Sequence, residues 1–145
     1  MTPMPTAADD SPGFLLWRVT LRWQRAVTAV LAPLGLTHVQ FVLLASTWWL
    51  NTQGEHPNQL SIARHADTDV KMTSQVLRKL EEKGLVVREV DPGDTRARRL
   101  RLTPQGQELA QRAVTEVERA DTEFFRSVPD STGLIAMLRP LASMS

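Results

Sequence analysis

The chain has 145 residues, 42% of them hydrophobic and 23% charged, with a formal net charge of +1 at pH 7. These values are typical of a single globular domain, and the absence of cysteine excludes a disulfide scaffold, a thiolate zinc site and a cysteine nucleophile. The longest apolar runs hold five residues, against about 20 for a membrane span, and no apolar stretch follows a basic start, so we expect a cytoplasmic protein without a membrane segment.

Residues 1–12 hold three prolines and two adjacent aspartates, and this composition predicts a flexible lead-in. From residue 14 to residue 31 apolar residues recur at helical spacing, and Pro33 and Gly35 end that helix. Three arginines of this segment, at 18, 22 and 25, lie on a different face from the apolar stripe.

The next predicted helix begins at Thr37, a good N-cap, with Gln40 three residues later completing a capping box. Residues 41–50 are apolar on nearly every side of the helix. A helix of this kind is expected to be buried all round, so we predict a central strut of the fold.

A helix-turn-helix is predicted over residues 58–84. Asn58 can cap a short helix at 59–66, and Asp69 can cap a longer helix at 70–83 after a turn at 67–69. Gly84 is the expected residue just past the C-terminus of the longer helix. A short helix, a three-residue turn and a longer helix have the spacing of this motif.

The longer helix has an apolar stripe on one face and a stripe of hydrogen-bond donors on another. The donor stripe carries no acidic residue and consists of Lys71, Ser74, Gln75 and Arg78. A recognition helix places such residues against base edges in the major groove, where Gln pairs with adenine and Arg with guanine. Taken alone, such a stripe is more often an ordinary solvated face; the preceding short helix and the following arginine-rich hairpin favour a recognition helix.

An arginine-rich β-hairpin is predicted after the helix-turn-helix. Residues 85–90 and 98–102 have strand patterns, and Asp91-Pro92-Gly93-Asp94 between them is strong turn chemistry. Residues 95–101 hold four arginines and no acidic residue, which makes the hairpin a candidate phosphate-binding element in this setting. A helix at 104–126, about 34 Å long, and a short helix at 131–139 complete the chain.

Four segments of the chain resemble the MarR family of winged helix-turn-helix transcription regulators. They are Leu36-Thr37 with Gln40-Phe41, the run from Leu80 to Arg88, the run from Asp91 to Ala97, and the run from Leu102 to Gly106. The resemblance covers residues 14–126 in order. It implies a mainly α fold with a small β-hairpin wing, in a single domain over 1–145.

The resemblance further implies a two-fold homodimer that binds a pseudo-palindromic double-stranded DNA operator. Residues 13–36 and 104–145 would form the helical dimerisation region, and residues 37–103 the winged helix-turn-helix lobe. In the wing, Asp94 would brace Arg96, and Arg96 would enter the minor groove, whose negative potential favours arginine. Arg98 and Arg99 would add phosphate contacts. Many members of the family are repressors that a small aromatic or anionic effector releases.

Two positions depart from the family pattern. Val70 and Met72 are apolar where many members carry small polar residues near the DNA. These two side chains cannot form hydrogen bonds to base edges, so the base contact open to them is with a thymine methyl group. The dimer itself has independent support, because a helix at 104–126 is too long and too thinly apolar to be covered by a lobe this small. Phe124, Phe125 and residues 134–138 would otherwise form an exposed apolar patch.

Other candidate sites are weaker. His38, His56 and His65 are scattered without metal-ligand spacing, and no nucleophile motif is present, so we expect no metal, no cofactor and no enzyme activity. All four tryptophans precede residue 50. Core packing explains them most simply, but Trp17 and Trp48 are candidates for the walls of an effector pocket.

The sequence therefore predicts a sequence-specific DNA-binding regulator that represses transcription in response to a ligand. Two alternatives stay open: a winged-helix module whose hairpin binds a protein, and a small-molecule binding dimer with little DNA specificity. Salt dependence separates the first alternative from DNA binding, because contacts to several phosphates weaken steeply as salt rises.

Overall fold

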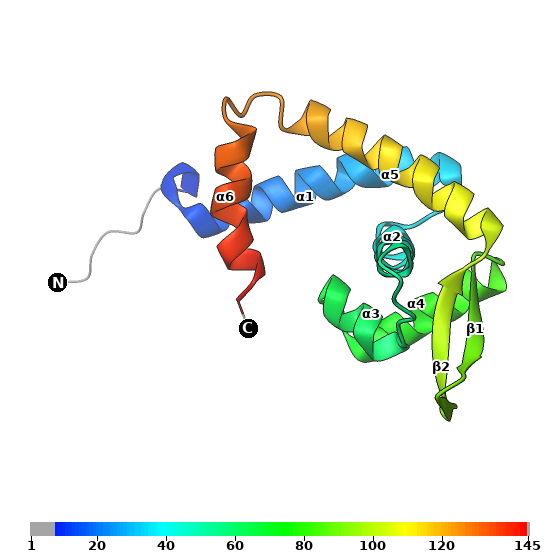
Figure 1. Ribbon diagram of the computed structural model, residues 1–145. Helices are drawn as coiled ribbons and strands as arrows, with labels where there is room; N and C mark the ends of the chain where they lie inside the picture. Colours follow the sequence, from blue (N-terminus) through cyan, green and yellow to red (C-terminus); the bar gives the residue numbers. More distant parts are fainter. Residues whose placement is uncertain (1–7, 145) are drawn as a thin grey trace.

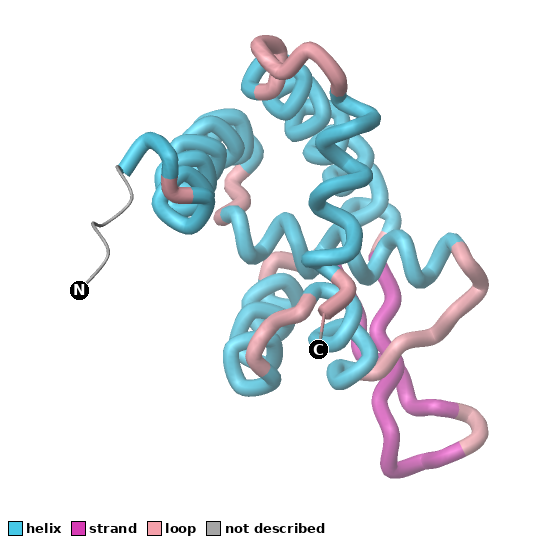
Figure 2. Tube along the Cα trace, turned by 90° about the vertical axis from the view of Figure 1, so that its left-hand side faces the viewer, coloured by secondary structure: helices cyan, strands magenta, loops and turns pink. Residues whose placement is uncertain are grey.

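The computed structural model describes residues 8–144, and residues 1–7 and residue 145 lie outside it. Figure 1 shows two layers. Long helices α1 (Pro12–Leu31) and α5 (Pro104–Phe124) run across the top, and α6 (Ser131–Ala142) descends steeply from the loop after α5 (Figures 1 and 2). Beneath them lies a lobe that holds α2 (His38–Thr52), α3 (Gln59–Ala66), α4 (Val70–Glu82) and a hairpin of β1 (Val86–Asp91) and β2 (Asp94–Leu102). This is the mainly α fold with a small hairpin wing that the sequence predicts.

The N-terminal helix begins earlier than predicted. Ser11 caps it by accepting the N–H of Phe14 at 3.3 Å, and Pro12 occupies the first helical position, where its missing N–H is not needed. A short 3-10 helix, η1 (Ala8–Asp10), precedes it. The flexible lead-in predicted over 1–12 therefore extends too far by at least five residues, and its first seven lie outside the described range.

The predicted capping box at the start of α2 is confirmed. The Thr37 hydroxyl accepts the N–H of Gln40 at 3.2 Å, and the Gln40 side chain accepts the N–H of Thr37 at the same distance. A 3-10 turn, η2 (Ala32–Leu34), and Gly35 at φ 73° connect α1 to this box. Sharp local geometry therefore fixes the corner between the two layers.

Helix α2 is the central strut, and Figure 1 views it end-on between the layers. Leu43, Leu44 and Thr47 are fully buried, and the Thr47 hydroxyl donates to the Leu43 carbonyl at 2.8 Å. The expectation that α2 is buried on all sides is wrong at Trp49, which is 55% exposed. Helix α2 packs against α1, α3, α4, α5 and β2, and the side that carries Trp49 faces solvent.

Local capping determines the helix-turn-helix as predicted. Asn58 accepts the N–H of Ser61 at 2.8 Å and begins α3, whose bounds match the predicted 59–66. Asp67, at φ 54°, ends α3, and Asp69 accepts the N–H of Met72 at 2.9 Å to begin α4. Helix α4 ends at Glu82, one residue before the predicted end, and Gly84 has the expected left-handed conformation at φ 75°.

The second strand of the wing is four residues longer than predicted. It begins at Asp94, which pairs with Asp91 at the turn; the regular antiparallel ladder runs from Val86↔Leu102 to Val90↔Arg98, and the register shifts between Val90 and Asp91. Residue alternation identified only the half-buried base of this strand. The pair Asp91↔Asp94, across a register shift, extends the hairpin to its exposed tip, where alternation carries no signal.

Helices α2 and α5 hold the base of the wing. The Asn51 side chain donates to the Leu100 carbonyl at 3.2 Å and accepts the Leu102 N–H at 3.1 Å. At the start of α5, the Thr103 hydroxyl donates to the Gly84 carbonyl at 2.7 Å and accepts the Gly106 N–H at 3.0 Å. The wing therefore leaves a base that is bonded on two sides.

Helix α6 contrasts with the rest of the fold, since none of its described residues is buried. Met137 is 67% exposed and Leu141 is 64% exposed. Within residues 8–144 no single helix is long and apolar enough to cross a membrane. Residues 12–34 and 38–52 reach that length and composition only together, and they are bent by 77°.

Gly106 provides a test of the junction at the base of the wing. A Cβ at this position would lie 2.0 Å from the Leu85 carbonyl oxygen, so Gly106→Ala must displace backbone and should destabilise the fold by about 1–3 kcal/mol in urea unfolding. Gly13→Ala is the matched control in the first turn of α1, where a Cβ meets nothing within 4 Å and should stabilise by about 0.5–1 kcal/mol. Equal effects of the two substitutions would contradict the close approach.

Candidate nucleic-acid interface

Helix α4 divides into a buried face and an exposed face. Thr73, Leu77 and Leu80 are fully buried against the lobe. The residues of the donor stripe lie on the opposite side, with Ser74 half-buried and Lys71, Gln75 and Arg78 exposed. The stripe predicted from the sequence is therefore a continuous surface of hydrogen-bond donors.

Bonds at the C-terminal end of α4 determine its orientation. Glu81 accepts the Nε of Arg88 on β1 at 3.1 Å, which ties the helix to the wing. The Lys83 ammonium donates to the Gly35 carbonyl at 2.6 Å and to Gln40 at 3.0 Å, which ties the helix to the corner before α2. Both anchors lie away from the N-terminal half of α4, so they leave the donor surface unobstructed.

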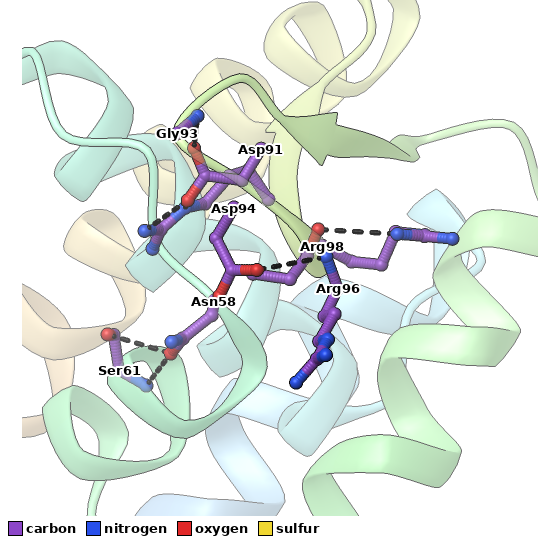
Figure 3. Close-up of polar contacts among 9 residues, drawn as sticks. Asn58, Ser61, Asp91, Gly93, Asp94, Arg96 and Arg98 are labelled. Carbon is purple, nitrogen blue, oxygen red and sulfur yellow. Dashed lines mark hydrogen bonds and ion pairs between the residues drawn. The ribbon is translucent and has the colours of Figure 1, made fainter.

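Two carboxylates shape the tip of the wing (Figure 3). Asp91 accepts the N–H of Gly93 at 2.9 Å, and Asp94 accepts the N–H of Arg96 at 3.0 Å. Asp94 therefore does brace Arg96, as expected, but it bonds to the backbone N–H of Arg96 and not to the guanidinium group. Figure 3 shows the Arg96 side chain pointing away from both carboxylates.

The structure separates Arg99 from the other predicted wing residues. Arg98 donates only to backbone carbonyls, those of Thr95 at 3.1 Å and Ala97 at 3.3 Å. Arg99 is instead held by Asp91, with Nε at 2.8 Å and Nη2 at 2.6 Å from one carboxylate oxygen. Successive strand residues face opposite sides, so Arg99 lies on the other face of β2 from Arg98.

A matching pair lies one step along the same face, where Arg101 binds Glu89. The bonds from Gly93 and Arg99 hold the pKa of Asp91 below its ordinary value. The bond from Arg101 likewise holds the pKa of Glu89 low. Both acids therefore stay ionised at neutral pH, and this face of the wing carries two closed ion pairs.

Sequence reasoning treated Asp91 as a turn residue only and did not consider Glu89. A signal for both was available. Acids at 89 and 91 share one face of the first strand, and arginines at 99 and 101 share one face of the second. Cross-strand ion pairs follow from that alternation once the hairpin is closed at the turn.

The predicted effector-pocket residues are not brought together in a cleft. Trp17 is 63% exposed on α1, and Trp48 packs half-buried against the core. A cleft of about 460 Å³ opens instead between α1, α2 and the turn of the helix-turn-helix. Its lining consists of Trp23, Gln24, Thr28, His38, Val39, Val42, Ala66 and Thr68.

Trp23 and His38 form one wall of this cleft and connect three helices. The Trp23 indole N–H donates to Asp121 of α5 at 2.8 Å, and the Trp23 and His38 rings meet edge to face with centroids 5.1 Å apart. Burial lowers the pKa of His38, and the nearby Asp121 carboxylate opposes that shift only in part. Among the residues described, no group of His and carboxylate side chains could hold a metal ion.

Comparisons with known sequences agree on one family. The MarR family model matches residues 36–97. The uncharacterized HTH-type transcriptional regulator YdcH of Bacillus subtilis is 41% identical to the chain, over 92% of this chain and 90% of that protein. The HTH-type transcriptional repressor Rv2887 of Mycobacterium tuberculosis is 36% identical, over 94% of this chain and 97% of that protein.

Solved structures give the same picture. CouR from Rhodococcus jostii RHA1 bound to p-coumaroyl-CoA has a TM-score of 0.84 and 31% identity, covering 97% of this chain and 98% of that one. The repressor CouR bound to a 23-mer DNA duplex has a TM-score of 0.78 and 26% identity, covering 98% of each chain. Rv2887 in complex with salicylic acid has a TM-score of 0.70 and 36% identity, covering 93% of this chain and 99% of that one.

Proposed function

This chain belongs to the MarR family, and we propose that it binds a pseudo-palindromic DNA operator as a homodimer and represses transcription until a small effector releases it. The protein is a DNA-binding transcription regulator with a winged helix-turn-helix fold. We assign it no catalytic role and expect it to act in the cytoplasm.

One observation carries the proposed DNA contacts. Within residues 8–144, the cations of the α4 donor surface and of the wing tip form no ion pair, whereas the other arginines of the hairpin all do. On these two surfaces the unpaired cations are Lys71, Arg78, Arg96 and Arg98. Cations without acidic partners are available to neutralise phosphates and to pair with base edges.

In this proposal Lys71, Ser74, Gln75 and Arg78 enter the major groove, and Arg96 enters the adjacent minor groove. Arg98 contacts phosphate. Arg99 is given a different role from the one expected, because its guanidinium is already bonded to Asp91. It holds the wing in shape and contributes no direct DNA contact.

The proposed dimer is supported by apolar surface that the chain does not cover itself. The outer halves of α1 and α6 expose large hydrophobic side chains, notably Leu16 at 56%, Trp17 at 63% and Met137 at 67%. A two-fold interface through 13–36 and 104–145 would bury these side chains. It would also place two recognition helices about 34–36 Å apart, one turn of DNA, with each 37–103 lobe on one half-site.

Effector binding is proposed from the relatives together with the cleft. CouR and Rv2887 are solved with p-coumaroyl-CoA and salicylic acid respectively, both aromatic acids or their derivatives. In this chain the cleft beside Trp23 has the size and the aromatic wall that a small aromatic effector needs. Because the cleft lies between α1 and the lobe, its occupant would contact both layers.

The function is tested by fluorescence anisotropy with labelled duplexes tiled upstream of the protein's own gene. We expect tight binding to one pseudo-palindrome and weak binding to random duplex. Binding should weaken by orders of magnitude between about 50 and 200 mM salt. Weak binding that is equal on all duplexes and insensitive to salt would contradict the proposal and favour a wing that binds protein.

The wing assignment is tested by Arg96→Ala. Loss of this cation should weaken binding to every duplex, most where the minor groove is narrow, and should reduce the slope of log affinity against log salt by about one. Arg119→Ala is the charge-matched control, since Arg119 lies on α5 and is paired with Glu116 at 2.9 Å. Equal affinity of Arg96→Ala and the control would refute minor-groove contact.

Base reading by α4 is tested by Gln75→Ala. We expect a loss of about 1–3 kcal/mol on the operator and almost none on random duplex, because a base contact is lost rather than a charge. Lys71→Ala is the comparison, and it should weaken both duplexes alike. If Gln75→Ala instead lowered the affinities for the operator and for random duplex equally, a base-reading role of Gln75 would be excluded.

A further inference from the structure

The cleft beside Trp23 contains no charged lining residue, and this bears on the chemistry of the proposed effector. Its polar lining comes from Gln24, Thr28, His38 and Thr68, and the rest is aromatic or aliphatic. Arg25 lines an adjoining groove along α1, which shares Gln24 and Thr28 with this cleft, but it does not line the cleft itself. An acidic effector would therefore find no arginine or lysine partner among the residues that line it.

The charges around the cleft disfavour an anion. Asp121 lies behind the aromatic wall, bonded to Trp23 at 2.8 Å, and forms no ion pair within residues 8–144. Burial favours the neutral form of His38 by lowering its pKa, so the imidazole does not offset the carboxylate. A negatively charged ligand would lose hydration and approach a carboxylate, whereas an uncharged ligand would meet neither cost.

The hydrogen bonds of Thr68 and Thr73 determine whether the Thr68 hydroxyl can donate to a ligand or only accept from one. Thr73 donates its hydroxyl proton to the Asp69 carbonyl at 2.7 Å. The Thr68 and Thr73 hydroxyl oxygens are 2.7 Å apart, so Thr68 must be the donor in that pair. Its proton is then committed, and only its acceptor lone pairs remain for a ligand.

We propose that this cleft binds an uncharged aromatic molecule that donates a hydrogen bond to the Thr68 hydroxyl. The inference rests on the proposed effector response and specifies the ligand of that response. A flat ring packs against Trp23 and His38, and a phenol or amide N–H completes the contact with Thr68. The ligand class differs from a free aromatic acid, which carries a carboxylate at neutral pH.

The same contact leads into the recognition helix. A ligand donor, the Thr68 hydroxyl, the Thr73 hydroxyl and the Asp69 carbonyl form one directed chain of hydrogen bonds, in which each bond polarises the next. Asp69 is the residue that caps α4. Occupancy of the cleft therefore acts on the first turn of the helix that carries Lys71, Ser74 and Gln75.

The ligand charge is tested with a matched pair of probes, 4-hydroxybenzamide and 4-hydroxybenzoate, titrated calorimetrically into the full-length protein at neutral pH. Both carry a phenol donor, and they differ in charge. We expect the amide to bind at least about tenfold more tightly than the carboxylate. Equal binding, tighter binding of the carboxylate, or no binding of either probe at millimolar concentration would overturn the proposal.

Asp121→Asn tests the cause of the preference. Asparagine has nearly the same shape and its amide oxygen can still accept the Trp23 N–H, so the wall is kept while the charge is removed. We expect the carboxylate probe to gain several-fold in affinity and the amide probe to change little. An unchanged ratio of the two affinities would show that Asp121 does not set the preference and would overturn the electrostatic argument.

The Thr68 contact is tested with Thr68→Val and Thr68→Ser. Valine keeps the shape without the hydroxyl and should lose affinity for the amide probe, whereas serine should retain it. Thr52→Val is the control, because Thr52 lies outside the cleft and bonds to the Trp49 carbonyl at 2.7 Å. Hydrogen exchange at the amides of Met72 and Thr73 should slow with the probe in wild type and not in Thr68→Val; no change in wild type would refute the link to α4.

The two levels of the proposal fail in different ways. Operator binding without any probe is measured in the same samples by anisotropy. A protein that binds its operator tightly but prefers the carboxylate probe would refute the ligand class and leave the regulator function standing. A protein that binds the amide probe but no DNA sequence selectively would refute the regulator function and leave the cleft assignment standing.

Discussion

The close contact between α5 and the start of the wing is the constraint on which the geometry of this protein depends. Gly106 approaches the Leu85 backbone so closely that a single Cβ would overlap its carbonyl oxygen. The Thr103 hydroxyl bonds at the same point to the carbonyl that follows α4. The end of the recognition helix, the base of the hairpin and the start of the long α5 helix thus meet at one junction. The position of the donor surface relative to α1 and α5 is determined there and at the corner before α2.

Features set by local chemistry could be predicted from the sequence. The caps at Thr37, Asn58 and Asp69 and the turn at Gly84 place helix ends within about two residues, because each depends on a few neighbouring bonds. The start of β2 could not be predicted in this way. Its first residue, Asp94, pairs with Asp91 across a register shift, which a pattern of burial does not reveal.

Features set by tertiary contact were the harder ones. Trp49 on α2 is exposed because no neighbouring element covers that side of the helix. The composition of α2 does not reveal how many elements pack around it. Trp17, Trp23 and Trp48 are alike in sequence terms, yet of these three it is Trp23 that lines the cleft beside α2, where its indole contacts Asp121 and His38. Likewise, the sequence does not distinguish the four arginines of β2. Two of them form ion pairs and two do not, because the folded hairpin brings Asp91 to Arg99 and Glu89 to Arg101.

The Asn51 amide has a consequence for how this fold can diversify. It bonds to a carbonyl and an N–H two residues apart on β2, so a one-residue slip of the hairpin would break both bonds and turn Arg99 and Arg101 toward the core in place of Leu100 and Leu102. Register is therefore enforced from the base and does not depend on the identity of the tip residues. Substitutions near Thr95 and Arg96 should therefore cost little in folding, so the exposed wing tip can vary in sequence while the scaffold stays unchanged.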